Sequence, residues 1–202
     1  MKNNTLITIT RQYGSGGREV SAIVAKKLGL RRYDRKIVEM AAKKMRDYGD
    51  MSIDDIIKDS YTAPDNAGSG IGDYAFERIP YFNRMYVEQA KIILGVAKNG
   101  SAVFLGRCAE YILKDFPNTY SFFIYADDEF RLNRAKDHYG SHSIKDLDNE
   151  DKNRQSYYAY YTGQTWGEPK NYDLMINTSK ISLEKAADLI IKYIELQQQD
   201  CK

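Results

Sequence analysis

The residues best suited to chemistry are the glycines and the arginine of Gly14-Ser-Gly-Gly-Arg18. An apolar, β-branched run, Leu6–Thr10, precedes them, and an amphipathic stretch follows, so the order predicts strand, tight turn and helix. Glycines let backbone N–H groups approach an oxyanion closely, and a helix N-terminus adds partial positive charge. We expect a phosphate cradle formed by Gly14, Ser15, Gly16, Gly17 and Arg18, flanked by Arg11; the alternative is a strand-to-helix connection without a ligand.

This loop departs from the P-loop pattern G-x-x-x-x-G-K-[ST]. With Gly16 as the second glycine, Gly17 takes the lysine position and Arg18 the hydroxyl position. A shift by one residue puts Arg18 at the lysine and Glu19 at the hydroxyl. Neither register keeps the hydroxyl that holds magnesium in P-loop proteins. Arginine supplies the charge of lysine, but as a planar fork instead of a compact ammonium.

Further along the chain lie four more candidate arginines, Arg107, Arg131, Arg134 and Arg154. Arg107 follows the apolar run 101–106 and can point into a crevice or tie a strand end to a helix. Arg131 and Arg134 share one helix face, as they would on a solvated helix too. One face of a predicted helix carries Asp151, Arg154, Tyr158 and Tyr161. This stripe predicts either the charged and aromatic face of a lid or tyrosines that pack on the body of the domain.

Clustered arginines suit phosphoryl transfer, because their forks match phosphate oxygens and the reaction needs charge stabilisation more than covalent chemistry. Asp34 and Arg35 stand where a short extended stretch enters a helix. There they can belong to the same site, or Asp34 can simply cap the helix.

Five predicted strands must position these residues, and helices separate them. The strands are expected at residues 6–10, 31–35, 101–106, 119–126 and 172–178. Apolar strands that alternate with helices favour a parallel sheet covered on both faces, with ligands bound beyond the carboxyl ends of the strands. The glycine-rich loop, Asp34-Arg35 and Gly106-Arg107 all fall at such ends.

The helices between the strands are predicted in less detail. Residues 76–98 favour one or two helices with Pro80 near a break, and a buried face formed by Val87, Ala90, Ile93, Leu94 and Ala97. A helix start is expected at Ser52, a mobile loop at residues 61–72, and a last helix capped by Ser182.

Composition narrows the class of protein. The chain has 202 residues and a formal net charge of +2, which argues against a general nucleic-acid surface. Cys108 and Cys201 are its only cysteines, and its apolar runs are shorter than a membrane span. We expect a cytoplasmic protein with small-molecule partners, no nucleic-acid or membrane partner, and a monomeric or homodimeric state.

Taken together, the motifs resemble those of the bacterial cytidylate-kinase-like proteins, a branch of the P-loop nucleoside monophosphate kinases. The matching stretches are residues 10–19, 33–35, 106–109, 151–154, 160–163 and 171–174. The resemblance implies an α/β fold of three layers, α/β/α, with a five-stranded parallel sheet and a helical lid segment. It implies one domain over residues 1–202, in which residues 35–100 form a helical acceptor-side region and residues 139–170 the lid-like segment.

The resemblance also implies transfer of the γ-phosphoryl of ATP to CMP or dCMP with Mg²⁺. By similarity, residues 14–18 hold the donor phosphates. The residues that correspond to acceptor binding are Asp34, Arg35, Arg107 and Asp151, and those that correspond to catalysis are Arg18, Arg131, Arg134 and Arg154. True members carry Lys-Ser/Thr where this chain has Arg18-Glu19, and Asp where it has Cys108.

These departures leave two other functions open. The chain could be a regulatory protein that binds a nucleotide without catalysis, because the loop lacks the usual lysine and hydroxyl. It could also phosphorylate a small molecule that is not a nucleotide, because Cys108 cannot accept a hydrogen bond from a sugar hydroxyl strongly.

Overall fold

The computed structural model describes residues 4–45, 74–139 and 143–200. Five parallel strands form one sheet in the order β2-β3-β1-β4-β5. The strands are β1 (Leu6–Arg11), β2 (Arg31–Tyr33), β3 (Ala102–Leu105), β4 (Thr119–Tyr125) and β5 (Leu174–Asn177). The predicted five-stranded parallel sheet is confirmed. The helix start at Ser52 and the loop at residues 61–72 lie outside the described residues.

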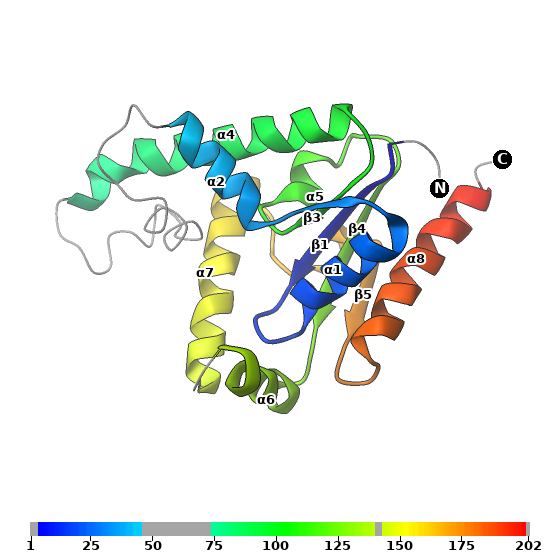
Figure 1. Ribbon diagram of the computed structural model, residues 1–202. Coiled ribbons are helices and arrows are strands. Elements are labelled where there is room, and N and C mark those ends of the chain that lie inside the picture. The colour runs from blue at the N-terminus through cyan, green and yellow to red at the C-terminus, as the bar shows by residue number, and fades with distance from the viewer. Residues whose placement is uncertain (1–3, 46–73, 140–142, 201–202) are drawn as a thin grey trace.

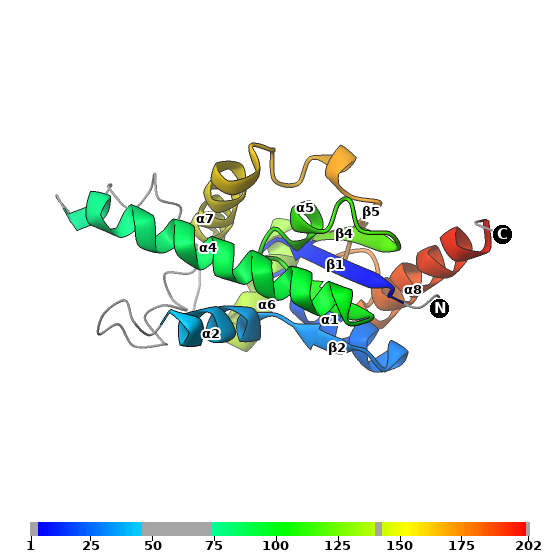
Figure 2. The same ribbon diagram turned by 90° about the horizontal axis from the view of Figure 1, so that it is seen from above.

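Helices cover both faces of this sheet (Figures 1 and 2). Helices α1 (Gly17–Leu28) and α8 (Leu183–Asp200) pack on one face, against Ile7 and Ile9 of β1. Helices α2 (Arg35–Lys44), α4 (Tyr74–Lys98) and α5 (Ala109–Ile112) pack on the other, against Leu6 and Phe104. Because side chains alternate along a strand, the sheet contributes side chains to a hydrophobic core on each of its faces. A sheet between two layers of helices is the result.

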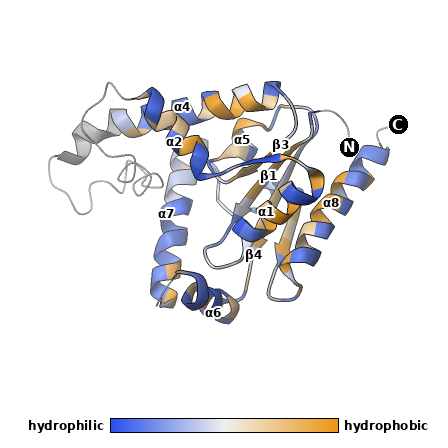
Figure 3. Ribbon diagram, in the orientation of Figure 1, coloured by the Kyte–Doolittle hydropathy of each residue, from blue (hydrophilic) through white to orange (hydrophobic). Residues whose placement is uncertain are grey.

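Two further helices stand beyond the carboxyl ends of the strands. They are α6 (Asp128–Tyr139) and α7 (Ile144–Thr162), and the short helix η3 (Pro169–Asn171) leads from α7 back to β5. Figure 1 shows α6 and α7 beside the loop between β1 and α1. In Figure 3, α7 is largely hydrophilic. A capping box at Ser143 and Asp146 starts α7, because each side chain bonds the other residue's backbone N–H. This helix lies within residues 139–170, the segment predicted to be lid-like.

Two expectations about α4 were wrong. The helix runs unbroken from Tyr74 to Lys98, although Pro80 lies inside it. A proline keeps a helical φ and removes only one backbone donor, so it need not end a helix. Val87 was expected in the core but is 46% exposed. The predicted Ile93 and Ala97 are buried, and Leu94 packs against the same core. The buried face also includes Phe82, Met85 and Ile92, so it is wider than predicted and leaves Val87 on its outer side.

The part of the chain that the structure describes contains no helix with the length and apolar character needed to cross a membrane. The division into an acceptor-side region at residues 35–100 and a lid-like segment at residues 139–170 stays a prediction.

Substitutions at two adjacent residues of α8 test whether this helix packs on the core that it shares with α1. Ile190 is fully buried and Leu189 is 47% exposed. We expect Ile190→Ala to lower the free energy of unfolding by about 2–5 kcal/mol, because it leaves a cavity. The matched control Leu189→Ala should change it by only about 0.5 kcal/mol. Urea denaturation followed by circular dichroism measures both; equal losses would contradict the packing described here.

Candidate active site

The glycine-rich loop between β1 and α1 is anchored at its start by Gln12. The backbone N–H of Gln12 donates to the carbonyl of Ile124 at 2.9 Å, and its side-chain oxygen accepts from the N–H of Ala126 at 3.2 Å. The hydroxyl of Ser15 donates back to the carbonyl of Gln12 at 2.8 Å. These bonds tie the loop to the end of β4 and fix the position from which α1 begins.

The glycines of this loop are required by close contacts. Gly14 and Gly16 have φ near +79° and +78°, which side-chain-bearing residues seldom adopt. A Cβ at Gly14 would lie 2.7 Å from the carbonyl oxygen of Arg131, and one at Gly17 would lie 2.5 Å from the Cβ of Arg11. No side chain caps α1. The N–H groups of its first turn are therefore suited to bind an anion.

A buried carboxylate, Asp151 of α7, joins this loop to two arginines. Its Oδ1 accepts from the backbone N–H of Tyr13 at 2.7 Å and from Arg154 at 3.1 Å, and its Oδ2 accepts from Arg131 at 2.6 Å. Arg131 and Arg154 are themselves buried. Burial raises the pKa of the Asp151 carboxyl, while Arg154, the Tyr13 N–H and Arg131 act against that rise. Two residues of the stripe predicted on α7, Asp151 and Arg154, are thus buried against the loop, whereas Tyr158 and Tyr161 pack with Cys108 and Tyr157.

Both arginines also contact the loop directly. Arg131 donates from Nε to the carbonyl of Tyr13 at 2.9 Å. Arg154 donates to the carbonyl of Arg11 at 3.3 Å and lies over the ring of Tyr13, with 5.2 Å from its Cζ to the ring centroid. Two residues predicted as catalytic therefore connect the backbone that follows β1 to the neighbouring helices. Arg131 links Tyr13 to α6, and Arg154 links Arg11 to α7.

The other two predicted catalytic arginines lie on either side of the start of α1. Arg134 pairs with Glu19 at 3.3 Å, and a second, buried oxygen of Glu19, Oε2, has no hydrogen-bond partner among the described residues. The side chain of Arg18 is 57% exposed and lies 3.7 Å from Asp34. Asp34 also pairs with Arg32 at 3.0 Å. Its side chain makes no cap bond to α2, so it faces arginines instead of acting as the helix cap.

Arg107 is placed by an unusual backbone. Arg107 and Cys108 have φ values of +64° and +54°, in the left-handed region where such residues are uncommon. Arg107 is buried and lines a cavity of about 20 Å³ together with Arg11 and Arg154; such a cavity admits about one water. By contrast, the predicted acceptor-binding residue Arg35 is exposed and pairs along α2 with Glu39 at 3.7 Å.

One buried acid, Glu110 of α5, was not predicted. Its Oε2 accepts from the hydroxyl of Thr10 at 3.3 Å, and it lines the same small cavity as Arg107. Burial raises the pKa of Glu110 from 4.5 to about 7. Burial also raises the pKa of the neighbouring Cys108 thiol. A lone glutamate on a short helix usually faces solvent, so nothing in its sequence context pointed to this role.

Comparison with solved structures identifies the fold class. The chain matches a shikimate kinase from Bacteroides thetaiotaomicron with a TM-score of 0.56 and 10% identity, covering 96% of this chain and 99% of that one. It matches a gluconokinase from Sinorhizobium meliloti 1021 with a TM-score of 0.54 and 11% identity, covering 98% of each chain. The protein therefore has the fold of the small P-loop kinases.

Sequence comparison identifies the family. The profile of the cytidylate kinase-like family matches residues 6–180, so the chain belongs to this family of phosphotransferases. An uncharacterized protein from Eubacterium ventriosum ATCC 27560 has a similar crystal structure, with a TM-score of 0.69 and 27% identity over 95% of this chain and 98% of that one. A search of curated protein sequences found no match.

The buried state of Glu110 can be tested through the pH dependence of stability. Its folded-state pKa of about 7 lies above the ordinary 4.5. The unfolded chain therefore releases this proton first, and wild-type stability falls as pH rises from about 4.5 to 7. Glu110→Gln removes that loss, so its free energy of unfolding relative to wild type should rise by about 3 kcal/mol across this window.

Urea denaturation at several pH values measures this difference. The exposed glutamate of α7, Glu150, provides the matched control, and Glu150→Gln should give a pH profile parallel to that of wild type. A parallel profile for Glu110→Gln as well would show that Glu110 is not buried as described.

Proposed function

We propose that this protein is a kinase that transfers the γ-phosphoryl of ATP to a small acceptor, with a nucleoside monophosphate such as CMP or dCMP as the first candidate. The observation that carries the proposal is that Arg18, at the start of α1, lies 3.7 Å from Asp34 at the end of β2. One arginine thus stands between the phosphate-binding loop and the expected acceptor side. A cation in that position can stabilise charge on a group passing between them.

The donor side of the proposed site is the loop itself. The backbone N–H groups of residues 14–17 lie at the N-terminus of α1, flanked in sequence by Arg11 and Arg18. Those of Ser15 and Gly17 make only long bonds of 3.4 Å within the loop, which an anion can replace. In this proposal Arg131, Arg134 and Arg154 neutralise the transferring phosphoryl from the lid side. Because Asp151 already bonds two of them, phosphate binding would exchange part of these contacts for contacts with the donor.

In this loop a carboxylate, and not the usual Ser or Thr hydroxyl, would be the protein ligand of a magnesium ion. The residue after Arg18 is Glu19 and carries no hydroxyl. Its buried Oε2 has no hydrogen-bond partner in the part of the chain that the structure describes, and a carboxylate oxygen is a ligand that Mg²⁺ accepts. Glu19 is therefore the residue that would hold the ion. The chemistry that Mg²⁺ supplies when bound is charge neutralisation on the donor phosphates.

The acceptor side is assigned to Asp34, Arg35, Arg107 and Asp151. Asp34 and the buried Arg107 follow neighbouring strands, β2 and β3, so both can face one ligand beyond the sheet. Cys108 is buried and stands where cytidylate kinases carry an aspartate. This exchange makes a small acceptor other than a nucleotide the second candidate within the same reaction class.

A regulatory role without catalysis is the third candidate. The buried contacts of Asp151 with Arg131 and Arg154 favour it, because they occupy guanidinium donors that phosphate would need. Nucleotide binding without product formation for any acceptor would support this role over kinase activity.

The substitution Arg18→Ala tests the kinase. We expect kcat to fall by about 10²–10³-fold, because one preorganised cation is removed from the transferring group. An ADP-release assay with ATP and Mg²⁺ across CMP, dCMP, UMP, AMP, GMP, shikimate and gluconate measures the effect. The exposed residue Arg31, at the opposite end of β2, gives the control Arg31→Ala. Unchanged turnover in Arg18→Ala would exclude the assigned role.

The substitution Glu19→Gln tests the metal ligand. A neutral amide binds Mg²⁺ more weakly than a carboxylate, so the Mg²⁺ concentration at half-maximal turnover should rise by about tenfold or more. Mg²⁺-dependent thermal stabilisation of the ATP complex should weaken in parallel. The exposed Glu195 of α8 supplies the control Glu195→Gln. An unchanged Mg²⁺ requirement would show that Glu19 is not a ligand.

A further inference from the structure

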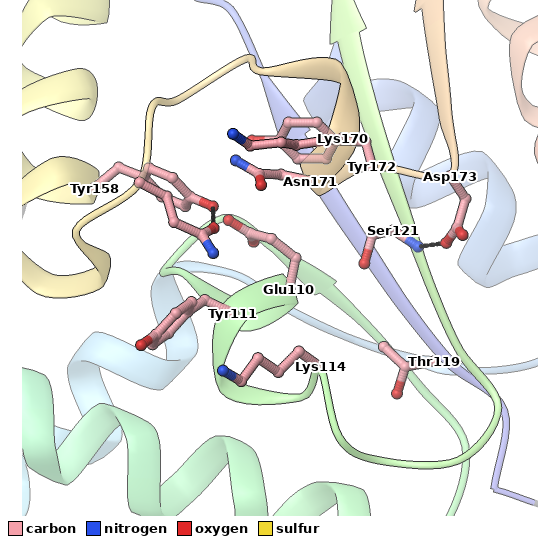
Figure 4. A pocket seen from close by; sticks show the side chains of 11 residues that line it. Glu110, Tyr111, Lys114, Thr119, Ser121, Tyr158, Lys170, Asn171, Tyr172 and Asp173 are labelled. Carbon is pink, nitrogen blue, oxygen red and sulfur yellow. Dashed lines mark hydrogen bonds between the residues drawn. The ribbon is translucent and has the colours of Figure 1, made fainter.

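A second cavity of about 290 Å³ opens on the face of the sheet opposite α1 and α8 (Figure 4). Its walls come from α5, from β4, from the end of α7 and from the segment around η3. Glu110 and Tyr158 line both this cavity and the arginine-lined cavity beside the loop. The two spaces are therefore separated by a single layer of side chains, and the new cavity has its own opening.

Three buried oxygen atoms of residues that line this cavity have no hydrogen-bond partner within the described part of the chain: the hydroxyl of Tyr172 and two others. One of these others is Oε1 of Glu110, whose side chain is only 5% exposed, and the second is Oγ1 of Thr119. Figure 4 shows Glu110 reaching toward the space in front of Tyr158 and Asn171. Buried polar atoms are nearly always paired in folded proteins, and leaving one unpaired is costly. These atoms therefore indicate a polar occupant.

The mouth of the cavity carries positive charge. Lys114 and Lys170 are exposed, and neither is in an ion pair with another described residue. The Nζ of Lys114 lies 4.9 Å from the ring centroid of Tyr111. The carboxylate of Asp173 also lines the cavity and keeps its negative charge, but its Oδ2 is held at β4, where it accepts the backbone N–H of Ser121 at 2.6 Å. Lys114 and Lys170 are the two cations that can reach an anion at the mouth.

We propose that this cavity binds a small hydroxylated anion, whose carboxylate or phosphate pairs with Lys114 and Lys170 and whose hydroxyl donates to Oε1 of Glu110. The volume lies near the lower end of the range for ligand pockets, so the ligand is smaller than a nucleotide. Carboxylate and phosphate satisfy the lysines equally well. This inference does not depend on the proposed kinase function, since it uses neither the loop nor its arginines.

Calorimetric titration of the full chain tests the site with D-glycerate and with glycerol 3-phosphate, which separate the two anionic groups. We expect saturable binding of at least one of them, with a Kd of about 1 mM or below. Lys114→Ala and Lys170→Ala should each weaken it by about tenfold, because each removes one charge-assisted contact. Both lysines are exposed, so neither variant should impair folding.

Three controls make the result specific. Lys185→Ala, at an exposed lysine of α8 on the other face, and Arg18→Ala, at the loop, should both leave binding unchanged. Propyl phosphate has the size of glycerol 3-phosphate without its hydroxyls, and it should bind about tenfold more weakly if Glu110 accepts a hydroxyl.

The proposal is overturned if neither hydroxylated anion binds saturably, or if both lysine variants bind with the affinity of the wild type. It is also overturned if Arg18→Ala abolishes binding, since the anion would then occupy the phosphate loop. Equal affinity for propyl phosphate would remove Glu110 from the site.

Discussion

The structure beyond the strand ends depends on one buried carboxylate. Asp151 connects α7 to the backbone of the β1 turn through Tyr13, to α6 through Arg131, and along its own helix to Arg154. Loss of the carboxylate would leave two buried positive charges less well compensated, although Arg131 also pairs with Asp128 at 3.1 Å and with Asp148 at 3.8 Å. Three segments far apart in the sequence, residues 11–13, 131 and 151–154, are thereby held as one unit. This unit fixes the position of α7 relative to the glycine-rich loop between β1 and α1.

The same contacts mean that two arginines of the proposed site are paired with a protein carboxylate in this structure. Arginines suited to phosphate are bound to an internal carboxylate, and the cavity beside Arg107 has room for about one water. In a kinase, the donor phosphates would compete with Asp151 for guanidinium groups, and closure or opening of α7 would follow the outcome. Exclusion of water by such a segment limits hydrolysis of the donor. The buried cluster of Asp151, Arg131 and Arg154 is therefore compatible with binding of the donor phosphates and with control of that binding by Asp151.

The sheet explains why a second polar cavity exists at all. One face of β1 presents Ile7 and Ile9 to α1 and α8, and the other presents Thr8 and Thr10. Thr8 bonds Ser121 of β4, and Thr10 bonds Glu110 of α5. The face under α5 is thus lined by hydroxyls over its centre, where an apolar core would usually lie. The alternation of side chains along β1 separates this hydroxyl-bearing face from the apolar face, and the helices cover both faces.

The sequence by itself determined the order of strands and helices, the parallel sheet and the loop at the first strand end, because these follow from apolar runs, glycines and short-range periodicity. It also singled out Arg107, Arg131, Arg154 and Asp151. Tertiary structure alone decided that Asp151 binds the N–H of Tyr13 and the guanidinium of Arg131, and that Glu110 is buried. The contact between Tyr13 and Asp151 joins residues 138 positions apart, and pairing at that distance depends on packing between elements, which no local pattern records.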